Sequence, residues 1–437
     1  MEQLSFLQNP VFEKYIGVFG FLFLIFILFL LSNNKRRISL RTLLVGIAMQ
    51  WAIALVLIKW PTGNAGMQWF AGKVAAFLAL SKHGSMFLFG KLGMPEMGGT
   101  FGFQFAFIVL PVIIFFASFS AILYYLGIMQ KVVEVFGWVM SKLLGTSGTE
   151  SLSCSANVFL GQTEAPLLVR PFLSRCTLSE LNAIMVGGFG TIAGSIMAGY
   201  MQMGISPEHI IIASSMAAPT SLMVAKMIFP ETEQSETMGN IKLPKLDSGR
   251  NILDAASRGV HDGLYLALNV GAMLVAFITL VVLVDKLLCL GDRYIDGMLL
   301  HGLMQEGGEF AGWFPGSLKT IMGSVFGPLA YLMGVPATDA FTVGHLLGLK
   351  LTLNEFVAYS KLAPMIQQGS LSPKAAIMAT YMLCGFANFA SIGIQIGGLS
   401  SLAPDRRSDL ARLAFKAMLG GAIVSCLTAT IAGLLIG

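Results

Sequence analysis

Residues 155–172, SANVFLGQTEAPLLVRPF, decide how this chain folds. The stretch holds Asn157 and Glu164 among residues that otherwise suit lipid, and such polar groups are costly at membrane depth. Gly161 and Pro166 both disfavour an unbroken helix through this point. We therefore expect a re-entrant hairpin, in which two short helical limbs meet at a polar tip that lines a cavity. The apolar neighbours disfavour the alternative, a surface loop between two spans.

The composition of the whole chain indicates a polytopic membrane protein. Its 437 residues are 55% hydrophobic and only 12% charged, whereas soluble proteins carry about 25% charged residues. The net charge of +5 is modest, and the basic residues gather in loops of one side. That pattern indicates membrane topology and no nucleic-acid partner. Five cysteines without paired spacing predict neither a disulfide framework nor a zinc site.

The apolar runs predict an all-α polytopic membrane protein with eight transmembrane helices, two re-entrant helical hairpins and interfacial helices. The eight spans are expected near residues 15–31, 43–60, 101–126, 178–203, 208–229, 264–288, 374–396 and 413–436. The interfacial helices are expected near 64–81 and 318–333. Basic loops at 33–41 and 403–412 are expected in the cytoplasm, together with the polar linker 231–250. Both termini then lie outside a cytoplasmic (inner) membrane that the chain crosses several times.

The second hairpin has a polar apex at residues 351–359. Its expected limbs, 342–349 and 356–365, are each too short to cross a hydrocarbon layer of about 30 Å. Glu355 stands at this apex as Glu164 stands at the first.

An internal repeat relates the two halves of the chain. Span four has a glycine-rich centre at 187–195, which favours either close helix packing or a local break with free carbonyls. We favour the break, since transporters build ion sites from discontinuous helices. Residues 188–194 align with 385–391 of span seven, so that Thr191 pairs with Asn388. The two hairpins start from opposite sides of the membrane, and the repeat is therefore inverted, as in secondary transporters.

The repeat divides the chain into four regions. These are a scaffold region at 1–145, a first transport repeat at 146–230, a linker with the sixth span and an outside segment at 231–316, and a second transport repeat at 317–437.

The polar residues of the two repeats suggest the class of substrate. Glu164 and Glu355 supply carboxylates, Gln162 and Asn388 supply amides, and Lys350 is the one cation close to either apex. A neutral solute that forms many hydrogen bonds fits this set better than an anion. A nucleoside fits it, and a sugar or an oligopeptide fits almost as well.

Four motifs resemble the concentrative nucleoside transporters, and the resemblance covers nearly the whole chain. The motifs are SANVF at 155–159, GQTEAP at 161–166, GLKLTLNEFVAY at 348–359 and CGFANFASIGIQIG at 384–397. The resemblance implies a homotrimer that imports nucleosides of the uridine, cytidine and adenosine class across the lipid bilayer by alternating access. The first three spans and the sixth are then the expected trimer contacts.

The resemblance also implies roles for single residues. Gln162, Thr163 and Glu164 would contact the base. Glu355, Asn388 and Ser391 would contact the ribose, and Ile196 would make an apolar contact from the first broken helix.

Members of this family couple transport to sodium or to protons. Sodium prefers several oxygen ligands, and this chain offers the Asn157 side chain, the Leu160 and Ile192 carbonyls and the Thr191 hydroxyl. Sodium-coupled relatives usually carry serine at the position of Thr191. We predict sodium as the coupling ion. In the alternative, Asn157 only ties the two limbs together, Thr191 bonds to its own helix, and Glu164 takes protons.

Two other classes of function have less support. A membrane-embedded enzyme could use the glutamates as acid and base, but the five histidines show no metal-ligand spacing, and no Ser or Cys nucleophile sits near a base. A passive channel would need a continuous polar pore and gives no reason for two hairpins. We therefore predict a transporter and no enzymatic activity.

Overall fold

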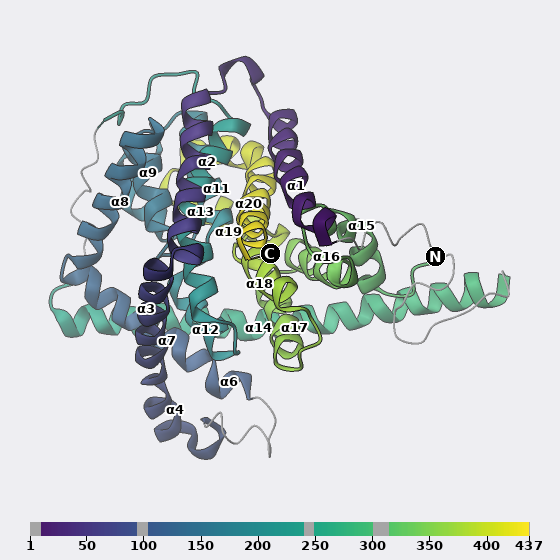
Figure 1. Cartoon of the computed structure of the whole chain (residues 1–437). Coiled ribbons are helices and arrows are strands. Elements are labelled where there is room, and N and C mark those ends of the chain that lie inside the picture. Colours follow the sequence, from purple (N-terminus) through teal and green to yellow (C-terminus); the bar gives the residue numbers. More distant parts are fainter. Residues whose placement is uncertain (1–9, 94–103, 240–248, 300–313, 437) are drawn as a thin grey trace.

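The computed structural model describes residues 10–93, 104–239, 249–299 and 314–436. Within these ranges the chain is helical and contains no strand, so the predicted all-α membrane fold is confirmed (Figure 1). Six of the described helices are long and apolar enough to cross a membrane, and two shorter apolar helices are Tyr15–Leu31 and Phe389–Leu402. The count of eight crossings, the two re-entrant hairpins and the interfacial helices stay predictions. The expected segments 101–103, 240–248 and 300–313 lie outside the described residues.

The N-terminal part consists of four longer helices, α1 (Pro10–Leu31), α2 (Leu40–Ala54), α3 (Pro61–Ala79) and α4 (Ser81–Phe89). The Ser39 hydroxyl accepts a hydrogen bond from Thr42 N and so caps the start of α2. Trp60 precedes α3, and Pro61 fits the first position of this helix because its missing N–H is not needed there. Helices α1 and α2 pack against α13 (Pro207–Ile228) and α20 (Arg407–Ile436).

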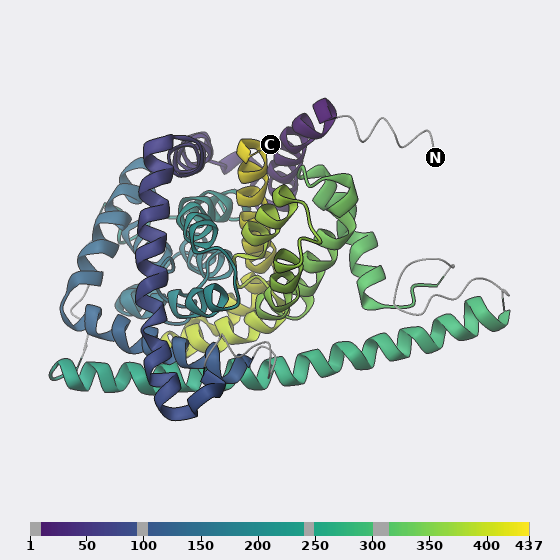
Figure 2. The same ribbon diagram turned by 60° about the horizontal axis from the view of Figure 1, so that its bottom comes forward.

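A second group comprises α6 (Phe105–Ile108), α7 (Leu110–Tyr125), α8 (Ile128–Leu144) and α14 (Ile252–Asp292). Helix α14 is a single helix of 41 residues, so the expected span 264–288 was too short at both ends. It runs along one side of the bundle and projects beyond it (Figures 1 and 2). Its length of about 60 Å is about twice the thickness of the hydrocarbon layer.

Helices α7 and α14 meet along what we call the glycine seam, formed by Gly259 and Gly263 of α14 against Ala117 of α7. A Cβ at Gly259 would lie 2.7 Å from the Ala117 carbonyl oxygen, and one at Gly263 would lie 2.8 Å from the Ala117 Cβ. Two glycines four residues apart let helix backbones approach closely in membranes. Any larger side chain at either position would push the two helices apart.

The remaining helices follow the same order twice: a hairpin, a broken helix and a long helix. The first set is hairpin 1, made of α9 (Gly148–Ala156) and of the segment Ala165–Val169 with α10 (Arg170–Leu173), then α11 (Leu178–Gly190), α12 (Gly194–Gln202) and α13. The second set is hairpin 2, made of α16 (Ala337–Thr352) and α17 (Glu355–Gln367), then α18 (Pro373–Leu383), α19 (Phe389–Leu402) and α20. Helix α15 (Leu318–Leu332) packs beside α16.

This order confirms the predicted break in span four, and span seven is broken at the aligned position. The limbs of hairpin 2 are longer than expected, with 16 residues in α16 and 13 in α17. At 1.5 Å per residue both limbs are still shorter than about 30 Å.

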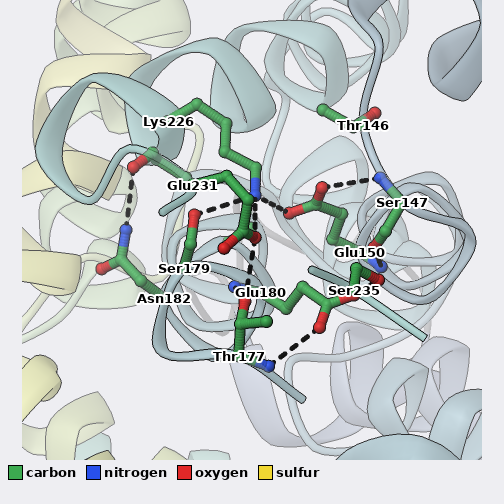
Figure 3. Close-up of polar contacts among 12 residues, drawn as sticks. Thr146, Ser147, Glu150, Thr177, Ser179, Glu180, Asn182, Lys226, Glu231 and Ser235 are labelled. Carbon is green, nitrogen blue, oxygen red and sulfur yellow. Dashed lines mark hydrogen bonds and ion pairs between the residues drawn. The ribbon is translucent and has the colours of Figure 1, made fainter. Parts of the chain in front are cut away.

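The base of hairpin 1 is fixed by a group of polar side chains, all of them buried except the partly exposed Glu231 (Figure 3). We call Glu150, Thr177, Ser179, Lys226 and Glu231 the Lys226 cluster. The Lys226 Nζ lies 2.7 Å from Glu150 Oε2 and 3.2 Å from Glu231 Oε2, and it donates to Ser179 Oγ at 2.8 Å. The Thr177 hydroxyl donates to Glu231 Oε2 at 2.9 Å. The cluster therefore joins α9, α11, α13 and the start of the linker.

Candidate functional site

The two helix breaks lie directly against each other. The Phe386 N–H, in the break between α18 and α19, donates to the Thr191 carbonyl in the break between α11 and α12 at 3.2 Å. Gly385 has a φ of +151°, and a Cβ there would lie 3.0 Å from the Phe189 carbonyl oxygen. Only glycine accommodates this backbone shape and this close approach together. The unwound backbone of both repeats thus meets in one place.

A cavity of about 160 Å³ lies where these breaks meet the two hairpin tips. It is lined by all seven side chains predicted to contact substrate: Gln162, Thr163, Glu164, Ile196, Glu355, Asn388 and Ser391. The structure brings them together from four elements that are distant in sequence, and their role in binding stays a prediction.

In the second repeat the polar side chains are already bonded to one another. The buried Glu355 carboxylate accepts hydrogen bonds from Tyr200 Oη at 3.2 Å and from Asn388 Nδ2 at 3.0 Å. The Asn388 Oδ1 accepts from Ser391 N at 2.8 Å and so caps the start of α19. Both ends of the Asn388 amide are therefore used, and the carboxylate is held at the cavity wall.

A second set of contacts holds Gln162 across the two repeats. Gln395 Nε2 donates to Gln162 Oε1 at 3.0 Å and to the Met185 carbonyl at 3.1 Å. Gln162 Nε2 in turn donates to Ser391 Oγ at 3.3 Å. Hairpin 1 is thereby tied to α19 through side chains.

Sequence reasoning missed Tyr200 and Gln395. Both are fully buried polar side chains on apolar helices. The signal for Gln395 was available, because it lies four residues after Ser391 and so on the same face of α19. Tyr200 gave no comparable signal, since a tyrosine in an apolar helix has an ordinary packing explanation: here its ring lies 4.2 Å from that of Tyr359, centroid to centroid.

Glu164 lies between two cavities. Its Oε2 accepts a hydrogen bond from Gly161 N at 3.2 Å, within the tip of hairpin 1. Beyond it a larger cavity of about 550 Å³ opens between hairpin 1 and the pair of α7 and α14, and Glu164 and Leu266 line both cavities. The larger cavity has the size of a typical small-molecule pocket, about 300–1,000 Å³, whereas the smaller one does not. Glu164 therefore lies in the wall that the two cavities share.

The four predicted sodium ligands lie at the tip of hairpin 1 and the first break. The Asn157 side chain is only 1% exposed, and in the described part of the chain neither of its amide atoms has a hydrogen-bond partner. A Cβ on Gly187 would lie 3.3 Å from Asn157 Nδ2, which places this amide against the end of α11. The Thr191 hydroxyl donates to the Gly187 carbonyl at 2.7 Å, the bond that the alternative reading expected.

A backbone contact also joins the two segments that carry the other predicted sodium ligands, the Leu160 and Ile192 carbonyls. The Gly194 N–H donates to the Phe159 carbonyl at 3.1 Å and so joins the hairpin tip, with Leu160, to the break that holds Ile192. No group of three His, Cys, Asp or Glu side chains that could hold a metal ion occurs among the described residues. A cation here would use neutral oxygens, and the unsatisfied Asn157 oxygen fits that purpose.

Comparison with known protein families decides the class of this site. The sequence signature described as "Na+ dependent nucleoside transporter C-terminus" matches residues 209–433, and the corresponding N-terminus signature matches 19–92. A third, described as "Nucleoside recognition", matches 106–207. This chain belongs to the Na⁺-dependent nucleoside transporter family. It is therefore an integral membrane transporter of the kind predicted, and not an enzyme, and a location in the cytoplasmic membrane is consistent with the family.

Individual members of the family match over nearly the whole chain. An uncharacterized transporter of Haemophilus influenzae is 44% identical over 428 residues, which are 96% of this chain and 97% of that protein. Sodium/nucleoside cotransporter 1 of Rattus norvegicus is 39% identical over 444 residues, which are 98% of this chain and 64% of the rat protein.

Solved structures of the transporter CNTnw share the fold of this family member. Its inward-facing substrate-bound state matches with a TM-score of 0.86 at 38% identity, over 97% of this chain and 99% of that one. A variant of CNTnw in an outward-facing state matches with a TM-score of 0.90 at 38% identity, over 98% and 99% of the two chains.

Proposed function

We propose that this nucleoside transporter is a secondary active symporter that imports nucleosides with sodium ions by alternating access. One observation carries the proposal. Polar side chains of both repeats converge on one cavity, and the buried Asn157 amide against the end of α11 has no partner within the described chain. A buried amide without hydrogen bonds is costly, so this one suits a ligand that the chain itself does not supply.

The chemistry of the cavity supports nucleosides of the uridine, cytidine and adenosine class. The Glu355 carboxylate and the Ser391 hydroxyl are acceptors for ribose hydroxyls, with Asn388 orienting the carboxylate. Gln162, Thr163 and Glu164 on hairpin 1 offer donors and acceptors for the edge of the base, and Ile196 offers an apolar contact.

The proposed sodium site uses the Asn157 side-chain oxygen, the Leu160 and Ile192 carbonyls and the Thr191 hydroxyl. The Thr191 hydroxyl donates its proton to Gly187, so its oxygen lone pairs remain free to accept a cation. In the proton-coupled alternative, Glu164 would carry the proton, and Asn157 would have no part in coupling.

The deciding experiment is uridine uptake into proteoliposomes that contain the full chain. We expect accumulation with an inward sodium gradient at fixed pH, and none with a proton gradient in sodium-free buffer. Asn157→Ala should weaken the dependence on sodium, whereas Asn182→Ala, which removes another buried asparagine whose Nδ2 donates to the Ala225 carbonyl, should not. Equal accumulation with protons alone, unaffected by Asn157→Ala, would reject sodium coupling.

We further propose that the chain assembles as a homotrimer. Helix α14 supports this, because much of its apolar surface is exposed, including Val275 at 73% and Leu290 at 60%. The sequence division into a scaffold region and two transport repeats is retained in this proposal. Mass measurement in mild detergent should give three copies, and a population of only monomers and dimers would contradict it.

A further inference from the structure

Lys350 is a fully buried lysine on the last turn of α16, in hairpin 2. Its Nζ donates to the Met382 carbonyl at 2.9 Å and to Ser425 Oγ at 2.6 Å. In the described part of the chain no carboxylate lies within ion-pair distance of this ammonium group. A buried charge without a counter-ion is costly, and an ionisable residue at membrane depth is by default functional.

The Met382 carbonyl, which accepts a hydrogen bond from Lys350, lies at the end of a helix. Met382 is the last residue but one of α18, which ends at Leu383 where span seven breaks. The last carbonyls of a helix lack partners within it and carry the negative end of its dipole. The ammonium group therefore stands where a broken helix presents free oxygens, and a small cation would be attracted to the same place.

The first repeat presents the same three elements around its own break. Asn157 is the C-cap of the first limb of hairpin 1, and Lys350 lies in the last turn of the first limb of hairpin 2, which ends at Thr352. Helix α11 ends beside Asn157, as α18 ends beside Lys350. Ser221 of α13 lies against Gly190 at that end, 2.6 Å from where a Cβ would be, in the way that Ser425 of α20 lies at the end of α18. In the first repeat these elements surround the proposed sodium site, and no side-chain cation is present there among the described residues.

We propose that the Lys350 ammonium group is a resident cation, which fills in the second repeat the position that a transported sodium ion fills in the first. This inference rests on the proposed sodium coupling. A covalently attached cation balances the negative helix end without drawing on the ion gradient. The number of sodium ions carried per nucleoside is then set by the side chain at position 350, and replacing it with a neutral, oxygen-bearing residue opens a second sodium site.

The test compares Lys350→Asn with the unchanged protein and with Ser425→Ala, which removes one acceptor but keeps the ammonium group. Sodium and uridine fluxes are measured with isotopes in proteoliposomes. We expect the ratio of sodium to uridine to rise from about one to about two in Lys350→Asn, with a matching rise in the Hill coefficient for sodium. It should stay at about one in Ser425→Ala. An unchanged ratio in Lys350→Asn would overturn the proposal.

Thermal unfolding of the purified proteins gives a second test, which also applies if Lys350→Asn folds poorly. A cation that binds only the folded state raises the unfolding temperature, so sodium in place of choline should stabilise Lys350→Asn more than it stabilises the unchanged protein. Recovery of folded variant by sodium supports the proposal, and unfolding that is the same in both salts overturns it. Different results would reject sodium coupling and the cation position at residue 350. Uptake by the unchanged protein that ignores sodium rejects sodium coupling, whereas a sodium dependence gained only in Lys350→Asn still supports a cation position at residue 350.

Discussion

Two buried asparagines next to the helix breaks are in opposite states. Asn388 in the second repeat uses both ends of its amide, donating to Glu355 and accepting from Ser391 N. Asn157 in the first repeat uses neither end within the described chain. At the break of the second repeat the chain also supplies its own cation, through Lys350, whereas among the described residues no side-chain cation lies at the break of the first. The second repeat is therefore assembled before any ligand arrives, whereas the first is completed by something that binds.

On the proposed function, this difference would give the two repeats separate tasks. A carboxylate held by Tyr200 and Asn388 would be oriented in advance for a sugar hydroxyl, which would lower the cost of binding. The first break, which lacks a partner for Asn157, would respond to the sodium ion instead. We expect changes in the second repeat to lower nucleoside affinity directly, and changes around the first break to act through sodium.

The largest effect is expected when hairpin 1 loses its attachment to the Lys226 cluster. In Lys226→Met the Glu150 carboxylate, which lies 2.7 Å from Lys226 Nζ in the unchanged protein, would stay buried without its cation. Removing one partner of a buried ion pair costs about 3–5 kcal/mol. Thermal unfolding in detergent should show this loss. Lys416→Met is the matched control, because Lys416 is only partly buried and donates to a backbone carbonyl, and equal stability of both variants would contradict the role of the Lys226 cluster.

Glu355→Gln tests whether the negative charge of Glu355 is needed to bind the nucleoside. The variant keeps the shape but loses charge-assisted hydrogen bonds worth about 1.5–3 kcal/mol, so uridine affinity should fall by about one to two orders of magnitude. Calorimetric titration with uridine measures this. Glu233→Gln, in the exposed start of the linker, should bind normally. Unchanged affinity in Glu355→Gln would remove this residue from the substrate site.

Glu164→Gln is expected to show a loss of the same order. Its carboxylate has one bond, from the Gly161 N–H, and faces both cavities. The same titration measures it, and normal uptake by this variant would mean that the carboxylate is not needed for transport.

Gln395→Ala tests the link between the two repeats, because Gln395 is expected to act on the nucleoside only by positioning Gln162. The loss of one hydrogen bond of about 1 kcal/mol predicts a fall of about fivefold in uridine affinity. Sodium affinity should be unchanged, since the proposed ion site does not include either glutamine. A purely structural role would instead lower stability and leave the affinity of the folded protein as it was.

The smallest effect is expected for Thr191→Ser, in the first break. Thr191→Ser keeps the oxygen and removes a methyl group, so the half-saturating sodium concentration should change by less than about twofold. Thr191→Val keeps the shape and removes the oxygen, and should raise that concentration by about tenfold, the effect of losing one contact to a charged group. Identical sodium dependence in the two variants would exclude the hydroxyl as a ligand.

The polar apices and the helix breaks could be predicted because their residue types are unusual in apolar, membrane-spanning sequence. Glutamates and glycines in sequence that suits lipid have few structural explanations, so Glu164, Glu355 and the break at Thr191 followed from local chemistry alone. Contacts between distant elements gave no such signal. Glu150 and Lys226 are 76 positions apart, as the two numbers show, and nothing local indicates that they pair.

The length of α14 was missed for a different reason. Arg258 and Asp262 precede its apolar part, and charged residues normally mark the end of a span. Here they continue the helix, which starts at Ile252 after the Asn251 cap and packs against α7.

The glycine seam gives spectroscopy a fixed frame of reference. Because Gly259 and Gly263 bring α14 into backbone contact with α7, we expect these two helices to move together, so that displacements of other helices can be referred to them. The polar His261 side chain of α14 is 67% exposed and Gln368 at the end of hairpin 2 is exposed, so both accept a spin label without disturbing the core. A pair of labels along α14 gives a reference distance, and a label pair from His261 to Gln368 then measures how far hairpin 2 moves during transport.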